Sequence, residues 1–233
     1  MTLRATPGVA WMSINDSGVV TGSALGNNQR RSGFIRAADG TMAFFDVPNA
    51  SQTGLGTVPV KINSQGVVVG YFSDSGGSVR GFMRAVDGTI MILDAPGIAS
   101  SCSSCLTQPA GINASGQITG VTYDGTLTQF FLRGSDGVYT TFSPPHAISS
   151  GSETGLLAVN GINDAGEIVG SYPDSTSVLH GFIRKTDGTF TALDAISAVS
   201  GEYGTVATGL NSSGAVVGRY SAAPQFSAGF VWQ

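Results

Sequence analysis

The segment INSQGVVVG at 62–70 decides the fold, because the chain repeats its pattern of polar and apolar residues. Related segments begin near residues 14, 112, 162 and 210, in steps of 48, 50, 50 and 48 residues. In each of them a short apolar run ends in Ile-Asn or Leu-Asn, an N-x-x-G turn follows, and a second apolar run comes next. This spacing predicts a protein built from five copies of one structural unit.

A second motif follows the first after 18 or 19 residues. It reads GFIRAADGT at 33–41, GFMRAVDGT at 81–89 and GFIRKTDGT at 181–189, with a degraded copy, FFLRGSDGV, at 130–138 and GFVWQ at 229–233. Asn or Asp followed by Gly between β-rich runs indicates tight hairpins. Each unit therefore predicts four short antiparallel strands, and units of this length are typical of β-propeller blades.

We predict one all-β domain over residues 1–233, a five-bladed β-propeller with four antiparallel strands per blade. The fifth copy ends directly after its third strand, whereas PGVA at 7–10 matches PGIA at 96–99, which follows a fourth strand. Residues 1–7 are therefore expected to complete the fifth blade as its outermost strand. Such a closure joins the two ends of the ring and leaves only protected strand edges.

Composition excludes several classes of protein. The 233 residues include 34 Gly but only 9 Pro, without a strict glycine period, and the mean hydropathy is +0.17, so collagen and disordered chains are excluded. A net charge of −4 with only two lysines, Lys61 and Lys185, argues against nucleic acid as a partner. No apolar run approaches the roughly eighteen residues that a membrane helix needs. MTLRATPGVAW at the start lacks the apolar core of a signal peptide, so the chain as given is expected to be soluble or already trimmed.

The tandem pattern INxxGxxVG, GFxR, DGT and LDAPG resembles the bacterial HAF-type extracellular repeat family over nearly the whole chain. Two positions depart from it, since Phe130 replaces a motif glycine and Trp232 replaces the motif arginine. The resemblance implies an extracellular or periplasmic location. Five short, similar blades are also similar in architecture to the tachylectin-like lectins, which bind N-acetylated sugars.

The predicted site is the face that carries the longer loops, which connect the second strand to the third and the fourth strand to the next unit. Asp74, Asp124 and Asp174 each stand four residues after the second-strand glycine, and a donor precedes each third strand. Carboxylates, donors and aromatic faces suit sugar hydroxyls and the apolar face of a sugar ring. The alternative for these residues is a hydrogen bond that braces the loop, or an exposed ion pair. The predicted ligand-binding residues are Asp74, Arg80, Tyr123, Asp124, Gln129, Tyr172, Asp174 and His180.

Other repeated residues are given structural roles. The asparagines of the N-x-x-G segments fit turn chemistry, and the third-strand phenylalanines fit packing between blades. Each GFxR arginine is expected to pair with the Asp three residues later or to brace its turn. The aspartates that end fourth strands, at 46, 94 and 194, are expected to cap the turns that follow.

The two cysteines and the two histidines offer few further candidate sites. Cys102 and Cys105 predict a loop disulfide in an oxidising compartment, with two free thiols as the alternative. His146 and His180, with Asp124, Asp174 or Glu153, match no known ligand spacing, so no metal and no cofactor is expected.

The leading functional hypothesis is a monomeric, lectin-like module that binds a carbohydrate or a glycan-coated surface through repeated weak sites. A carbohydrate-active enzyme, either a glycosidase or a lyase, is the first alternative. Its candidate acids are Asp124, Asp174, Glu153 and Glu202. A structural or protein-interaction repeat domain is the second alternative.

Overall fold

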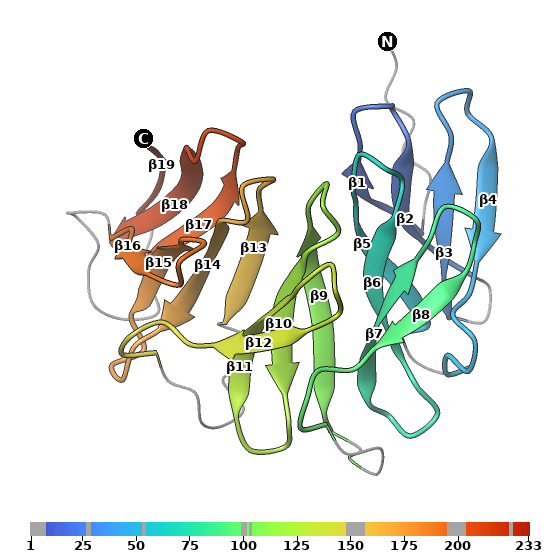
Figure 1. Cartoon of the computed structure of the whole chain (residues 1–233), viewed down its shortest axis with the longest axis horizontal. Coiled ribbons are helices and arrows are strands. Elements are labelled where there is room, and N and C mark those ends of the chain that lie inside the picture. The colour runs from blue at the N-terminus through green and yellow to red at the C-terminus, as the bar shows by residue number, and fades with distance from the viewer. Residues whose placement is uncertain are drawn as a thin grey trace. The chain divides into compact units, whose positions relative to one another are not determined.

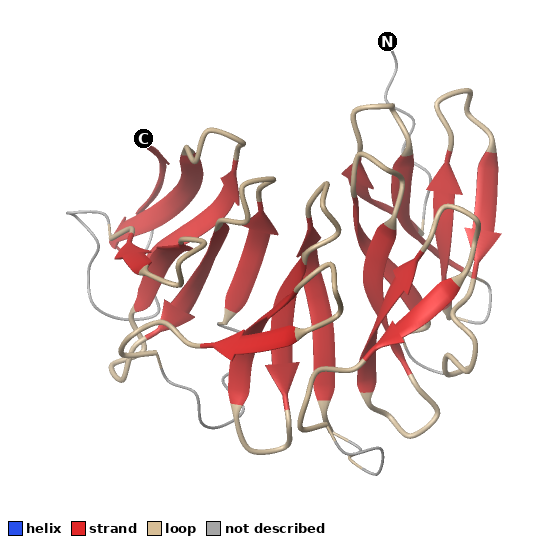
Figure 2. Ribbon diagram, in the orientation of Figure 1, coloured by secondary structure: helices blue, strands red, loops and turns tan. Residues whose placement is uncertain are grey.

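The computed structural model describes residues 8–26, 29–52, 55–98, 102, 104–147, 157–194, 204–223 and 226–233. Within these ranges the chain forms strands, turns and loops without a helix (Figure 2). The prediction of an all-β fold is therefore confirmed. The described part of the chain also holds no helix long and apolar enough to span a membrane.

The chain divides into two compact units, which are described separately here. The first comprises Met1–Asp94 with Ile98–Pro109, and the second comprises Ala95–Gly97 with Ala110–Gln233. Repeats 1 and 2 lie in the first unit, and most of repeat 3 with all of repeats 4 and 5 lies in the second.

The first unit contains two antiparallel arrays, in which each strand pairs with its neighbours in sequence (Figure 1). Repeat 1 forms β1 (Val9–Ile14), β2 (Val20–Leu25), β3 (Arg31–Arg36) and β4 (Met42–Phe45), and repeat 2 forms β5 (Thr57–Ile62), β6 (Val68–Ser73), β7 (Val79–Arg84) and β8 (Ile90–Leu93). A single parallel bridge between Val79 and Leu106 adds the start of β9 (Leu106–Ile112) to β7.

The second unit repeats this arrangement. Its strands are β10 (Ile118–Tyr123), β11 (Thr128–Arg133), β12 (Tyr139–Phe142), β13 (Ala158–Ile162), β14 (Ile168–Pro173), β15 (Leu179–Arg184), β16 (Phe190–Ala192), β17 (Thr205–Leu210), β18 (Val216–Ala223) and β19 (Phe226–Trp232). Repeat 5 shows three described strands, and residues 1–7, the predicted fourth, lie outside the described residues. The described strands make four sheets rather than five, because the Val79–Leu106 bridge merges repeats 2 and 3.

The cores lie between consecutive repeats. In the first unit Ile35 and Phe45 of repeat 1 pack on a buried cluster that includes Val68 and Phe82 of repeat 2. Phe82 is fully buried, as are its counterparts Phe34, Phe131 and Phe182. Burial of these rings removes a large apolar area from water. Packing between repeats is confirmed for Phe82 and Phe182, whose ring centres lie 6.0 Å from Phe45 and 5.3 Å from Phe130 of the preceding repeat.

The repeated asparagine has two roles. Inside its own turn, Oδ1 of Asn163 accepts the backbone N–H of Glu167 at 2.9 Å. Its amide Nδ2 then donates across to the carbonyl of Asn211, in the next repeat, at 3.1 Å. Asn113 makes the same 3.1 Å bond to the carbonyl of Asn163, and both asparagines are buried. The turn role is confirmed, and the bond between repeats explains why asparagine rather than aspartate is needed.

The repeated arginine also braces its turn and contacts a neighbour. Nη1 of Arg184 donates to the carbonyl of Lys185, and its guanidinium lies 4.7 Å from the centre of the Phe142 ring in the preceding repeat. Arg84 lies 5.0 Å from Phe45 in the same way. The turn brace is therefore confirmed. The charge of each arginine also acts on the Asp three residues later, and a cation–π contact to the preceding repeat is added at both arginines.

Candidate functional site

The aspartates between the second and third strands cap their loops. These loops span four or five residues, no more than the N-x-x-G turns, so the prediction that they are longer is wrong. Oδ1 of Asp174 accepts the backbone N–H groups of Thr176 and Val178 at 2.8 and 3.0 Å, and also the Thr176 hydroxyl. The same role is played by Asp74 toward Gly76 and Ser78, and by Asp124 toward Thr126 and Leu127. One oxygen of each carboxylate thus fixes the loop, in agreement with the bracing alternative, and the second is left for other contacts.

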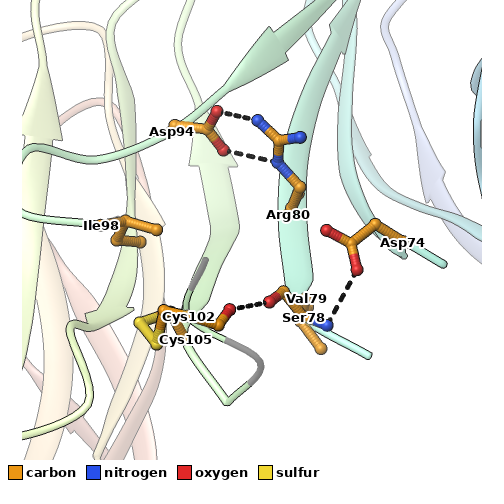
Figure 3. Close-up of a pocket in the computed structure, with 8 residues that line it drawn as sticks. All are labelled: Asp74, Ser78, Val79, Arg80, Asp94, Ile98, Cys102 and Cys105. Carbon is orange, nitrogen blue, oxygen red and sulfur yellow. Dashed lines mark hydrogen bonds and ion pairs between the residues drawn. A yellow bond between two sulfur atoms is a disulfide. The ribbon is translucent and has the colours of Figure 1, made fainter. Parts of the chain in front are cut away.

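In repeat 2 a cation lies between this loop and the end of the fourth strand. Nε of Arg80 donates to Oδ1 of Asp94 at 2.9 Å, and Nη2 donates to Oδ2 (Figure 3). The hydrogen bond to Asp94 raises the pKa of Arg80, against an opposing effect of burial, and the charges of Asp94 and Asp74 add to the rise. Arg80 therefore stands between two carboxylates.

Repeat 4 builds the same arrangement with a histidine. Nδ1 of His180 lies 2.9 Å from Oδ1 of Asp194, and Nε2 lies 3.3 Å from Oδ2 of Asp174. The ring of Tyr172 stacks on the imidazole with 5.4 Å between centroids. The structure thus brings together three of the predicted site residues, Tyr172, Asp174 and His180, and adds Asp194 to them.

Repeat 3 lacks this arrangement. Gln129 lies opposite Thr122 in the β10–β11 ladder, and no hydrogen bond joins it to Asp124 in the described structure. The hydroxyl of Tyr123 donates to the carbonyl of Gly125 at 2.8 Å, so it too serves its own loop. The three predicted residues of this repeat therefore lie near one another without forming a cluster.

The prediction that the fourth-strand aspartates cap turns is wrong. Asp94 and Asp194 bind the cation of the preceding strand instead, and Asp46 pairs with Arg30 at 3.1 Å. Cross-strand register explains this, since the ladder that pairs Gly81 with Leu93 places Arg80 next to Asp94. A separation of 14 residues between cation and carboxylate, identical in repeats 2 and 4, was the signal available in the sequence.

A pocket of about 80 Å³ lies beside Arg80 in the first unit. Its polar wall consists of Asp74, Arg80 and Asp94, and its other wall includes Ile98 and the cysteines (Figure 3). The remaining lining residues are Ser78, Val79, Cys102 and Cys105.

The predicted disulfide between Cys102 and Cys105 is present and forms one edge of this pocket. The Ser78 hydroxyl donates to the carbonyl of Cys102, and the Val79 N–H donates to the carbonyl of Cys105 at 3.2 Å. The closed disulfide loop is thereby held against the start of β7.

Metal ligands do not gather in the described part of the chain. No group of three or more His, Cys, Asp or Glu side chains within it is placed to hold a metal ion. Both candidate glutamates, Glu153 and Glu202, lie outside the described residues.

The charge state of His180 depends on its two carboxylates. Burial lowers its pKa, but the hydrogen bonds to Asp194 and Asp174 and the charges of both outweigh burial, so the pKa is raised above its ordinary value of 6.5. Hydrogen bonds from Thr176 and Val178 hold the pKa of Asp174 well below its usual range. The two aspartates therefore favour the protonated form of the His180 imidazole.

This cluster predicts that the second unit loses stability as the solution becomes alkaline. Because the folded-state pKa of His180 is raised, its contribution is fully present below about pH 6.5 and is lost as the pH rises through the raised pKa. Urea unfolding at about pH 5.5 and pH 8.5 should give a lower free energy of unfolding at the higher pH. His180→Gln should flatten this dependence. An unchanged slope in that variant would assign the dependence to another group.

Comparison with known proteins identifies no family. Neither a protein-family model nor a curated protein matches the chain. Among solved structures the chain is similar to a mutant of the Aleuria aurantia lectin in complex with Fucα1-6GlcNAc, with 9% sequence identity and a TM-score of 0.29. The match covers 95% of this chain and 94% of that chain. The resemblance to HAF-type repeats stays a prediction.

Proposed function

We propose that this protein is a lectin-like module that binds carbohydrate at the loops between the second and third strands of its repeats. The observation that supports this most directly is the recurrence of one arrangement in repeats 2 and 4. In both, a cation on the third strand stands between a loop aspartate and a fourth-strand aspartate, namely Asp74–Arg80–Asp94 and Asp174–His180–Asp194. Structural bracing alone does not require this, because repeat 3 folds without it.

The exposure and chemistry of these groups suit a sugar. The side chains of Arg80 and Asp94 are 38% and 37% exposed, so a ligand can reach both. Arginine keeps N–H groups beyond the two that Asp94 uses, and each carboxylate keeps lone pairs, so vicinal hydroxyls can donate and accept at once. Tyr172 is buried and stacks on His180, so it orients the imidazole and offers no open face to a sugar. Tyr123, Asp124 and Gln129 remain proposed contacts in repeat 3.

The acidic residues favour binding over glycoside hydrolysis. A glycosidase needs one carboxylic acid whose pKa is raised so that it holds a proton near neutral pH. The candidates Asp124 and Asp174 show the opposite, since backbone N–H groups and, for Asp174, the Thr176 hydroxyl lower their pKa values. Neither is therefore suited to act as a general acid.

We also propose that the five repeats close into a five-bladed β-propeller. The end repeats expose a face that inner repeats bury: Ile14 is 66% exposed, whereas its counterparts Ile62 and Ile112 are 6% and 9% exposed. Val217 of repeat 5 is 48% exposed, whereas its counterpart Val169 is fully buried. Consecutive repeats pack these two kinds of face together, so the faces left at the ends are complementary.

Two further features fit a secreted monomer of this kind. Among the described residues β19 pairs only with β18, which leaves an edge for residues 1–7 as a fourth strand. A disulfide between Cys102 and Cys105 persists in oxidising compartments, which supports an extracellular or periplasmic location.

A glycan array tests the proposed binding. Labelled protein should bind a defined set of glycans, and the double variant Asp94→Asn, Asp194→Asn should bind them at least tenfold more weakly, because each site loses the carboxylate that holds its third-strand cation. Asp39→Asn, Asp87→Asn is the matched control, since these two aspartates cap turns at the other end of the third strand. Folded protein that binds no glycan, or a double variant that binds as well as the control, would refute the proposal.

A further inference from the structure

The Arg80 pocket carries more negative than positive charge. Arg80 directs two of its N–H groups at Asp94, so that pair is neutral as a whole. Asp74 is the additional charge, since Oδ1 accepts the N–H groups of Gly76 and Ser78 while Oδ2 accepts no hydrogen bond from the described residues. Figure 3 shows that second oxygen turned toward the strand of Arg80. Among the described residues, the pocket therefore offers a carboxylate oxygen that accepts no hydrogen bond.

Repeat 4 has the same excess of carboxylate. Asp174 and Asp194 contact opposite nitrogens of one imidazole, and a protonated His180 neutralises only one of them. At higher pH, where His180 loses its proton, the excess becomes larger.

The size of the pocket indicates which part of a ligand it holds. About 80 Å³ is well below the roughly 300–1,000 Å³ of a pocket that encloses a whole small molecule. It accommodates one substituent of a sugar, with Ile98 and the disulfide against the apolar ring atoms. The substituent that matches Asp74 and Asp94 is a donor, and a charged donor gains most.

We propose that these sites select glycans that carry a free amino group, such as oligomers of glucosamine; this rests on the proposed carbohydrate binding. An ammonium group has three donors and a positive charge, which satisfy Oδ2 of Asp74 and the outer lone pairs of Asp94. A uronate meets repulsion from both carboxylates, and it reaches the guanidinium fork only by displacing Asp94. An N-acetylated sugar offers one neutral N–H and no charge.

Calorimetric titration with three oligomers of equal length tests the selection. At about pH 6 the glucosamine oligomer should bind at least tenfold more tightly than its N-acetylated counterpart, and a glucuronate oligomer should bind least. The double variant Asp74→Asn, Asp174→Asn should lose about tenfold for the glucosamine oligomer and little for the N-acetylated one. Asparagine keeps the Oδ1 acceptor that fixes each loop, so the loops should stay intact.

Asp87→Asn, Asp187→Asn is the matched control. These aspartates also cap turns in repeats 2 and 4, at the other end of the third strand, through the N–H groups of Thr89 and Thr189. Both double variants remove two negative charges from a chain of net charge −4, so non-specific attraction of a polycation changes equally.

Equal losses of affinity for the glucosamine oligomer in both double variants would overturn the proposed selection. Tighter binding of the neutral or the uronate oligomer would overturn it while leaving the lectin proposal standing. If none of the three oligomers bound and the glycan array were also blank, both the proposed selection and the proposed carbohydrate binding would be refuted.

Discussion

Replacing Gly170 by alanine is expected to lower the free energy of unfolding of the second unit by about 3 kcal/mol. Gly170 lies in β14 between β13 and β15. A Cβ placed there would stand 2.2 Å from the carbonyl oxygen of Ala158 and 2.7 Å from the ring of Phe182. Neither neighbour can move freely, because the carbonyl belongs to the adjacent strand and the ring is buried in the core. The strand or the ring must therefore shift.

Gly209→Ala is the control for this prediction. A Cβ at Gly209 in the same unit meets its nearest atom, in Val217, at an ordinary 3.7 Å, so the change should stay below about 1 kcal/mol. Urea unfolding followed by far-ultraviolet circular dichroism measures both variants. If the two variants were equally stable, the close approach of β13, β14 and Phe182 would not exist in solution.

Placing a charge at Ile14 should cost about 3 kcal/mol of unfolding free energy if the ring closes as proposed. Closure would bury the side chain as the side chains of Ile62 and Ile112 are buried, and an unpaired carboxylate in such a place is strongly destabilising. Ile14→Asp, compared with the unsubstituted chain by urea unfolding at several protein concentrations, gives the measurement.

Val86→Asp provides the matched comparison, because Val86 is 66% exposed, as Ile14 is, but lies in a hairpin turn of an inner repeat. Its substitution should change stability by less than about 0.5 kcal/mol. Equally small effects at both positions would show that the repeat 1 face stays exposed and that the ring is open. A penalty at Ile14 that grows with protein concentration would show that a second copy of the chain covers that face.

Most of the strand order follows from short-range signals. The N-x-x-G and D-G turns set the hairpins through residues two to five apart. Their glycines at 66 and 88 adopt φ values of +85° and +95°, which residues other than glycine rarely adopt. Because the same signals recur along the chain, a correct strand assignment for one repeat also assigns the strands of the others. The sheet count could not be predicted in this way, because one bridge between Val79 and Leu106 depends on where the disulfide loop lies.

The sequence predicted the members of the two candidate clusters only in part. Asp74, Arg80, Asp174 and His180 were among the predicted residues because each stands at a constant distance from a repeated glycine. Asp94 and Asp194 were assigned to turns, because an aspartate before a turn satisfies its backbone in many contexts. Their pairing with a cation depends on the cross-strand register of the hairpin formed by the third and fourth strands.

The amino-acid sequence alone specifies the five repeats and the all-β class, and it gives loop capping as one of two roles for Asp74, Asp124 and Asp174. Each of these depends on hydrogen bonds within a few residues. Tertiary structure decides which groups meet. It places Arg80 between Asp74 and Asp94, and it links Asn113 to Asn163 across 50 residues. The physical reason is that a turn constrains only its own backbone, whereas contacts between strands and between repeats depend on register and on how the apolar faces pack.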